Sequence, residues 1–204
     1  FTDELIDVFA TEPKVVKYVD LPLQHAHDAV LRSMNRPDTR EGVEKLIKKL
    51  REHIPGVAIR STFIVGFPGE TDTHYQALRS FVEEQRFDKV GIFTYSEEED
   101  TPAASMMQKV SEEVMQERYH DLMSLQSKIS EEINIGLEDQ ELDVLIEGRD
   151  AEQQAIAVGR SYREAPEVDG QIYIEGDTES QVGEIVRVHL LQGFTYDIVG
   201  ERVH

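Results

Sequence analysis

The feature that most constrains the fold is a set of three apolar runs separated by helical patterns. Residues 15–23 read VVKYVDLPL, residues 57–67 read VAIRSTFIVGF, and residues 89–96 read KVGIFTYS. Short apolar runs rich in β-branched residues predict buried strands. Between the runs, apolar residues recur at helical spacing, at Val43, Leu46, Ile47, Leu50 and Ile54 and again at Tyr75, Leu78, Phe81 and Val82. Strands that alternate with helices in this order predict parallel βα units.

Capping residues predict where these helices begin and end. The first helix is expected to start near Ala26 to Asp28, and the NRP that follows ends it, because the residue before a proline avoids the α region. Asp38 is the expected N-cap of the second helix, with Glu41 completing a capping box. Thr71 is the expected N-cap of the third helix, directly after the PGE turn.

The pattern changes at Ser111. An apolar stripe at Met115, Tyr119, Leu122, Ile129 and Ile133 predicts a linking helix of about 25 residues. Beyond Gly136 come five short strand candidates with glycines between or beside them, at 142–148, 154–160, 171–176, 184–191 and 195–203. We therefore expect an α/β unit over residues 1–110, the linking helix over 111–136, and a small antiparallel β-barrel over 137–204.

The composition excludes several classes of protein. The 204 residues include no cysteine, which excludes disulfides, thiolate nucleophiles and cysteine-ligated clusters in this stretch. No apolar run approaches the roughly eighteen residues of a membrane span, and the opening FTDE does not resemble a signal peptide, so a cytoplasmic location without membrane contact is expected.

The charge is strongly acidic. The formal net charge is −20, and residues 137–204 contribute −11 of it, with sixteen Asp or Glu, five Arg and no Lys. Nucleic-acid binders normally present a basic face, so this balance argues against an RNA or DNA partner. A basic protein partner is one interpretation of the acidity, and simple solubility is the other.

Polar residues gather where the first strand ends, at Gln24, His25 and His27. Two histidines can begin a metal site, but zinc needs further ligands and none converges in the sequence. The commoner interpretation is a set of polar groups at the carboxyl end of a barrel strand, where ligands bind. Arg60 stands inside an apolar strand and therefore needs an anionic partner.

The run GFPGET at 66–71 invites comparison with phosphate-binding loops. It lacks the lysine of the phosphate loop and the glycine spacing of the dinucleotide fingerprint. A tight turn between a strand and a helix explains its glycines.

Four longer motifs resemble one family. YVDLPLQHAHDAVLRSMNRP, RSTFIVGFPGET, FDKVGIFTYSEEEDTPAASM and AVGRSYREAPEVDG resemble the methylthiotransferase branch of the radical S-adenosylmethionine enzymes. Within that branch they are most similar to the members that modify an aspartate of a small-subunit ribosomal protein. The resemblance covers essentially the whole chain. It implies that residues 1–110 are the second half of a radical SAM barrel, a partial TIM-type barrel, and that residues 137–204 are a TRAM-like barrel.

The resemblance also implies binding residues. S-adenosylmethionine would be bound by Gln24, Arg60, Ile64, Val65, Phe93, Thr94 and Tyr95. Gln24 would meet the ribose and methionine parts, and Arg60 would pair with the methionine carboxylate. The basic ribosomal protein would be contacted by His25 and by Glu164, Glu167 and Asp169 of the loop REAPEVDG. His27 would lie at the pocket rim or face the substrate.

The implied reaction needs more than this chain. Family members hold two 4Fe–4S clusters through cysteines, so this cysteine-free chain is expected to bind neither and to be inactive alone. In the full-length enzyme, cleavage of S-adenosylmethionine would give a 5′-deoxyadenosyl radical that takes hydrogen from the aspartate β-carbon, and methylated sulfur would then be delivered there.

Two alternatives remain at this point. One is a transfer-RNA methylthiotransferase whose TRAM barrel binds RNA, which the lysine-free, acidic barrel argues against. The other is a non-catalytic acidic interaction module, which a C-x-x-x-C-x-x-C motif encoded upstream would exclude.

Overall fold

The computed structural model describes residues 1–203, and the chain divides into two compact units. The first unit contains Phe1–Val15 and Val19–Gln126, and the second contains Val16–Tyr18 and the residues from Ser127 onward. The long helix α5 (Glu112–Ile135) passes from one unit into the other. The boundaries expected at 110 and 136 remain predictions. Among the described residues, no helix is both long enough and apolar enough to cross a membrane.

The first unit is built around a three-stranded sheet in the order β1 (Tyr18–Gln24), β2 (Ala58–Val65) and β3 (Lys89–Thr94). Strand β2 pairs in parallel with β3, in a register that sets Arg60 beside Lys89 and Val65 beside Thr94. The connections are helical, with α2 (Asp28–Ser33) and α3 (Arg40–His53) before β2 and α4 (Asp72–Gln85) before β3. This arrangement confirms the predicted parallel β/α segment.

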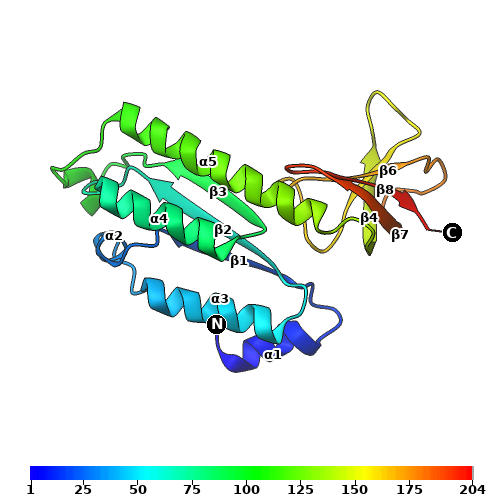
Figure 1. The fold of residues 1–204 in the computed structure, drawn as a ribbon, viewed down its shortest axis with the longest axis horizontal. Helices are drawn as coiled ribbons and strands as arrows, with labels where there is room; N and C mark the ends of the chain where they lie inside the picture. The colour runs from blue at the N-terminus through cyan, green and yellow to red at the C-terminus, as the bar shows by residue number, and fades with distance from the viewer. Residues whose placement is uncertain (204) are drawn as a thin grey trace. The chain divides into compact units, whose positions relative to one another are not determined.

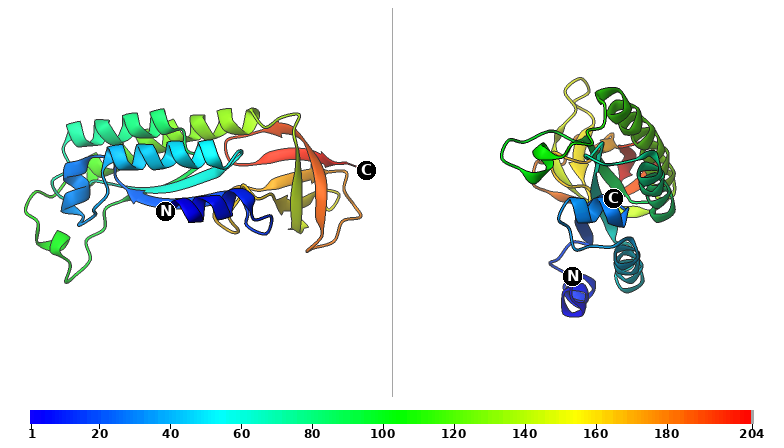
Figure 2. Two further views of the ribbon diagram at one scale, coloured as in Figure 1. Left: turned by 90° about the horizontal axis from the view of Figure 1, so that it is seen from below. Right: turned by 90° about the vertical axis from the view of Figure 1, so that its left-hand side faces the viewer.

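Helices α3, α4 and α5 lie along one face of the sheet (Figures 1 and 2). Side chains of β2 alternate accordingly: Phe63 and Val65 are fully buried, whereas Thr62 and Ile64 are partly exposed. Phe63, Phe81 and Phe87 form a cluster of edge-on and tilted rings between β2 and α4. The opposite face of the sheet, on which Thr62 and Ile64 lie, is partly exposed; it is called the open face below.

Most expected elements are present, with small differences at the ends. Thr71 caps α4, as its position predicted, and it also forms a capping box with His74. The predicted cap of α3 was wrong by one residue, because Thr39 rather than Asp38 accepts the Gly42 N–H, at 3.2 Å. Two elements were not anticipated, the helix α1 (Asp3–Thr11) and the 3₁₀ turn η1 (Pro102–Ser105).

The second unit contains a closed five-stranded barrel in the order β4-β5-β6-β8-β7. The strands are β4 (Glu141–Arg149), β5 (Ala157–Arg160), β6 (Ile172–Glu175), β7 (Ile185–Gly193) and β8 (Ile198–Arg202). The prediction of a small barrel is confirmed, but its antiparallel description was wrong, because β6 and β8 pair in parallel. A closed ring with an odd number of strands cannot alternate direction at every step, so at least one neighbouring pair must be parallel.

The barrel interior is filled by aliphatic side chains. Each of the residues that form this core is at most 4% exposed: Val144, Ile146, Ala157, Ile172, Ile174, Val186, Val188, Leu190 and Ile198. Glycine is required where strands approach closely. A Cβ on Gly159 would lie 2.3 Å from the Leu145 carbonyl oxygen, whereas a Cβ on Gly148, on the neighbouring strand, would meet nothing within 4 Å.

This difference predicts the outcome of a matched pair of substitutions. Gly159→Ala should lower the free energy of unfolding by about 1–3 kcal/mol, because the barrel must expand to admit the methyl group. Gly148→Ala should change it by less than about 1 kcal/mol. Urea unfolding followed by circular dichroism measures both, and equal effects of the two substitutions would contradict the packing seen at Gly159.

Candidate ligand cavity at the strand ends

A cavity of about 670 Å³ lies at the carboxyl ends of the three strands of the first unit. Gln24 ends β1, Ile64 and Phe67 come from the end of β2 and the turn after it, and Phe93 comes from β3. The remaining lining residues are Ser33, Met34, Asn35, Arg36, Thr94, Tyr95, Ser96, Thr101, Pro102 and Ala103. The volume is within the usual range for sites that bind small molecules. The mostly apolar wall with a few polar groups is also typical of such sites.

Five of the seven residues predicted to bind S-adenosylmethionine line this cavity: Gln24, Ile64, Phe93, Thr94 and Tyr95. Val65 does not, because its side chain is fully buried on the helix-covered face of β2. Neighbouring residues of a strand point to opposite faces, so Ile64 and Val65 could not both line one cavity through their side chains.

Arg60 lies on the open face of the sheet but four residues before Ile64, which is about 13 Å along the strand. Its Nη1 is 2.7 Å from the Oδ2 of Asp20 on β1, and its side chain is 16% exposed. The anionic partner that the sequence predicted is therefore present within the chain. Contact between Arg60 and a bound carboxylate remains a prediction.

The backbone of Gln24 is unusual for its residue type. Its φ angle is 70°, in the left-handed region that residues other than glycine, asparagine and aspartate rarely occupy. Such a conformation costs of order 1–3 kcal/mol and persists only where surrounding contacts impose it. The cost falls on a residue that lines the cavity.

Tyr95 carries a buried hydroxyl group for which no hydrogen-bond partner is found among the described residues. Its ring packs edge-on against Phe67, with the ring centroids 5.4 Å apart. Tyr95 also lines a second cavity of about 460 Å³ whose wall includes Gly66, Glu97, Lys109 and Met115. The Tyr95 side chain therefore borders both cavities.

Behind the cavity, a buried network joins the ends of β1 and β2 to helix α5. The Nε2 of His25 is 3.3 Å from the Oε2 of Glu70, and both side chains are fully buried. The same Oε2 accepts the Gly66 N–H at 3.1 Å, and the Oε1 pairs with the Nη1 of Arg118 at 2.7 Å. Arg118 also pairs with Asp72 at 2.6 Å. A buried carboxylate needs such compensation, and here Arg118 supplies it.

The histidines that the sequence singled out belong to this framework. The Nδ1 of His25 accepts the His27 N–H at 3.0 Å, and the Nδ1 of His27 caps α2 by accepting the Ala29 N–H at 3.2 Å. Within the described residues no group of three or more potential ligands could hold a metal ion. The predicted contact between His25 and a substrate stays a prediction, on a side chain that is 1% exposed.

The loop REAPEVDG of the second unit is held by its own acidic residues. Glu164 is buried and accepts hydrogen bonds from the backbone and hydroxyl of Ser161 at 2.9 and 2.7 Å. Asp169 accepts the Tyr18 hydroxyl at 2.7 Å and the Ala165 N–H at 2.9 Å. Of the three predicted contact residues, only Glu167 projects its side chain to solvent.

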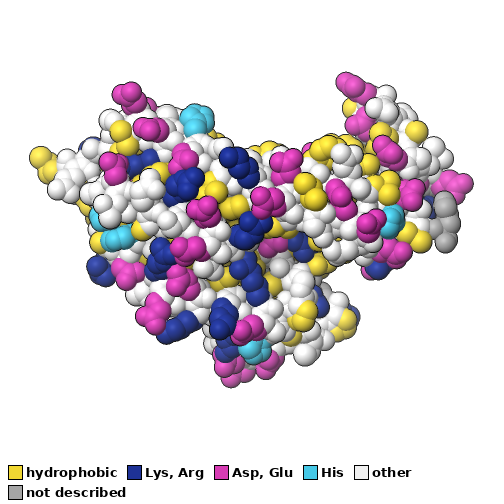
Figure 3. All heavy atoms as spheres, in the orientation of Figure 1, with side chains coloured by type: hydrophobic (Ala, Val, Ile, Leu, Met, Phe, Trp, Pro, Cys, Tyr) yellow, Lys and Arg dark blue, Asp and Glu magenta, His cyan; other side chains and the backbone are white. Residues whose placement is uncertain are grey.

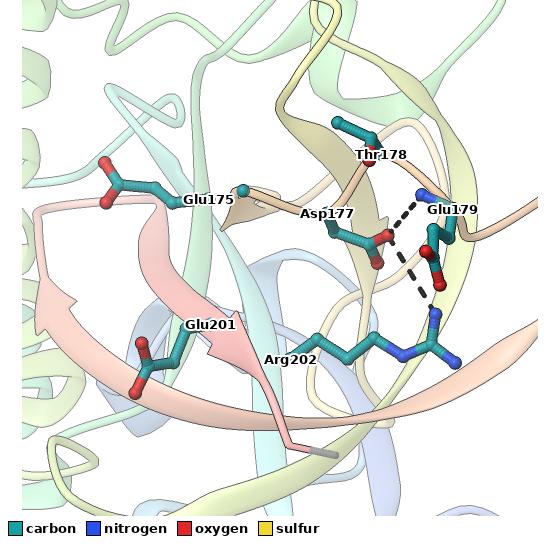
Figure 4. A pocket seen from close by; sticks show the side chains of 7 residues that line it. Glu175, Asp177, Thr178, Glu179, Glu201 and Arg202 are labelled. Carbon is teal, nitrogen blue, oxygen red and sulfur yellow. Dashed lines mark hydrogen bonds and ion pairs between the residues drawn. The ribbon is translucent and has the colours of Figure 1, made fainter.

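A different acidic hollow of about 290 Å³ lies at one rim of the barrel (Figure 4). Asp177 is buried there; burial opposes its ionisation, but hydrogen bonds from Ser180 and Glu179 and the charge of Arg202 hold its pKa below the usual value. Glu175 and Glu201 are exposed neighbours in the β6–β8 register. Figure 4 shows their carboxylates on the side away from the Asp177–Arg202 contact.

Comparison with known proteins decides the family. A family model of the radical SAM superfamily matches residues 1–82, and a TRAM domain model matches residues 140–203. The ribosomal protein uS12 methylthiotransferase RimO of Geobacter sulfurreducens is 47% identical over 200 residues, which is 98% of this chain. The RimO of Heliobacterium modesticaldum is 50% identical over 203 residues, or 100% of this chain. This chain is a homologue of RimO.

The chain spans less than half the length of these RimO relatives, 44% in both cases. A solved structure described as coproporphyrinogen III oxidase (HemN) from Escherichia coli, a radical SAM enzyme, is 17% identical, with a TM-score of 0.48, and the match covers 55% of this chain and 27% of that one. A likeness this weak adds nothing to the assignment.

The sequence interpretation missed several residues of the site. Glu70 and Arg118 are 48 positions apart, and Glu70 stands in no pattern that marks a buried ion pair. Phe67 and Arg36 line the cavity from loops whose path the sequence does not define. A lone arginine within the apolar stripe of the linking helix was the one available signal for Arg118, because a charge on a buried face requires a partner.

His27 makes the stability of this framework depend on pH. Burial, together with the nearby His74 and His25, holds the pKa of His27 below its ordinary value of 6.5. The unfolded chain therefore takes up the proton first as the pH falls, so stability is complete above about pH 6.5 and decreases below it. A protonated Nδ1 also cannot accept the Ala29 N–H.

His27→Asn should remove the contribution of His27 to the pH dependence of stability, because asparagine caps a helix without titrating. Between about pH 7.5 and pH 5.5, the loss of unfolding free energy should be smaller in the variant than in the wild type. Thermal unfolding across this range measures the difference. His53→Asn, at an exposed position near the end of α3, serves as the control for the histidine-to-asparagine change itself.

Proposed function

We propose that this chain is part of an enzyme that methylthiolates an aspartate of ribosomal protein uS12. The observation that carries the proposal is the identity of 47–50% to RimO proteins across essentially the whole chain. The radical SAM match over residues 1–82 and the TRAM match over 140–203 support it. Such a reaction belongs in the cytoplasm, where ribosomal proteins are assembled.

S-adenosylmethionine suits the cavity at the strand ends. The lining offers the apolar side chains of Ile64, Phe67 and Phe93 for an adenine ring, and the amide of Gln24 for ribose hydroxyls or the amino-acid group. Tyr95 also lines the cavity, and its buried hydroxyl has no hydrogen-bond partner among the described residues. When bound, S-adenosylmethionine supplies the radical chemistry together with an iron–sulfur cluster.

The contribution of this chain is to bind and orient. Gln24 binds the ribose end of the ligand, and the apolar side chains of the cavity cover the adenine. Arg60, which lies on the open face of the sheet four residues before Ile64, attracts the methionine carboxylate. No residue here supplies a thiolate, since the sequence contains no cysteine. The clusters of the full-length enzyme are therefore held by other parts of it.

Arg60 and Asp20 offer a matched pair for testing the pocket in the full-length enzyme. Arg60→Leu should weaken binding of S-adenosylmethionine by about 1.5–3 kcal/mol, roughly ten- to a hundredfold, because a charge-assisted pair is lost. Asp20→Asn should not weaken it, since the arginine remains available. Gln24→Ala should weaken the binding of S-adenosylmethionine by about 0.5–1.5 kcal/mol, because one neutral hydrogen bond is lost. Isothermal titration calorimetry measures all three.

The matched variants separate a binding role from a structural one. If Arg60 serves only to pair with Asp20, both substitutions should lower thermal stability and neither should change the affinity for S-adenosylmethionine. That result would show that Arg60 does not bind S-adenosylmethionine.

The acidic barrel is the proposed docking surface for the basic ribosomal protein. Acidic side chains are spread over the face of the second unit seen in Figure 3. Several of its carboxylates are neutralised by the chain's own arginines, as Arg187 pairs with Glu141 and Asp143 and Arg160 pairs with Glu147. Glu175 and Glu201 are neighbours in the register of β6 and β8, and both are exposed, so both carboxylates are accessible to a cationic partner.

This docking predicts a charge-reversal effect. Replacing Glu175, Glu179 and Glu201 by lysine should slow association with uS12 at low salt and flatten its salt dependence, because long-range attraction is screened beyond about 8 Å at physiological ionic strength. These side chains are exposed, so the fold should tolerate the change. Stopped-flow association over a series of salt concentrations measures the rate.

Lysine substitutions of Glu113, Glu117 and Glu131, exposed on α5, form a control of equal charge change and should slow association less. If both sets of substitutions slowed association equally, the slowing would be explained by the change in net charge and not by a docking surface on the barrel. Tight binding of transfer RNA by the unaltered protein would contradict the docking proposal and favour an RNA substrate.

A further inference from the structure

The residue that most needs explanation is Gln24, because its left-handed backbone (φ 70°) is imposed on a side chain that does not favour it. Gln24 is the last residue of β1 and lines the 670 Å³ cavity. Alternation along β1 puts Gln24 on the same face as Asp20, which pairs with Arg60, so an extended backbone would also face the cavity; the left-handed φ instead changes the direction of the amide and of the chain that follows. The contacts that hold the following residues therefore decide where the amide lies.

Those contacts begin at His25, the next residue. Its side chain is fully buried, and its Nδ1 accepts the His27 N–H at 3.0 Å. A neutral imidazole that accepts at Nδ1 carries its hydrogen on Nε2. The Nε2 is 3.3 Å from the Glu70 Oε2, although the alignment falls short of a hydrogen bond. The position of the ring is therefore set from two sides, by the turn into α2 and by Glu70.

Glu70 in turn ties this point to β2 and to α5. Its carboxylate accepts the Gly66 N–H at 3.1 Å and pairs with Arg118 at 2.7 Å, and its own N–H donates to the Phe67 carbonyl at 2.8 Å. Gly66 has a φ angle of 79°, and a Cβ there would lie 2.1 Å from the Met115 side chain. The turn after β2 is thus locked against α5 with the carboxylate at its centre.

The geometry points to Glu70 as a positioning residue of the cofactor cavity: it acts through His25 to hold Gln24 in its left-handed conformation. This role rests on the proposed function only for the identity of the ligand that Gln24 meets. A simple staple that stabilises the fold is the competing explanation. The two differ in what happens to Gln24 when Glu70 changes.

The Glu70→Gln variant of the full-length enzyme keeps the size of the side chain and removes its charge. In its crystal structure, the φ angle of Gln24 should leave the left-handed region and the amide should shift from its present position at the cavity wall. Retention of the left-handed Gln24 would overturn the positioning role, whatever the ligand is.

Binding gives the second readout, with S-adenosylmethionine as the probe in calorimetry. Glu70→Gln should weaken binding roughly two- to tenfold, as Gln24→Ala does, because both remove one neutral hydrogen bond from the ligand. The double variant should bind no more weakly than Gln24→Ala alone, since Glu70 acts through Gln24. Additive losses would mean that Glu70 acts on the site by another route, and would overturn the proposal.

Asp72→Asn is the matched control. Asp72 pairs with the same arginine at 2.6 Å, but its side chain is 95% exposed. The substitution should leave both the conformation of Gln24 and the affinity unchanged. If Gln24 relaxes in Glu70→Gln while Gln24→Ala binds S-adenosylmethionine as the wild type does, the positioning role stands and the proposed cofactor contact fails. The two ideas are thereby separated.

Discussion

The ion pair between Glu70 and Arg118 is the interaction on which the first unit most depends. Both side chains are buried, at 0% and 6% exposure, so each charge would be costly without the other. The carboxylate also receives the Gly66 N–H and faces His25, so three chain segments meet at one group. A buried charge with this many partners selects one arrangement of the strand ends among several that the apolar core alone would tolerate.

The arrangement of the strand ends determines the shape of the cavity. Gln24 ends β1, Phe67 follows β2, and Tyr95 follows β3, where its N–H donates to the Val65 carbonyl at 2.9 Å. The buried Tyr95 hydroxyl has no hydrogen-bond partner among the described residues, which is an exception to the rule that buried polar groups are hydrogen-bonded. Residues next to one another in the sequence divide these tasks: Gln24 faces the cavity, and His25 supports it from behind.

The barrel shows a comparable division among its acidic residues. Glu164, Asp169 and Asp177 accept hydrogen bonds from nearby N–H and hydroxyl groups and so shape loops. Glu175, Glu179 and Glu201 face solvent. Net charge alone does not distinguish the two kinds, because a carboxylate that is fully hydrogen-bonded inside a loop cannot meet a partner. A surface for a basic protein is therefore smaller than the number of acidic residues implies.

Local patterns in the chain were enough to predict the order of the strands and of the helices between them, the small barrel and the likeness to RimO, because hydrophobic periodicity and short motifs depend only on neighbouring residues. They did not predict the helix α1 or the turn η1. The resemblance to the family implied seven cofactor-binding residues, and five of them line one cavity. The folded packing was needed to define the partner of Arg60, the burial of His25 and Glu164, and the pairing of Glu70 with Arg118. The parallel pairing of β6 with β8 was also defined only by the folded structure. Each of these features depends on groups far apart in the chain, which come within contact distance only when the strands and helices have packed together.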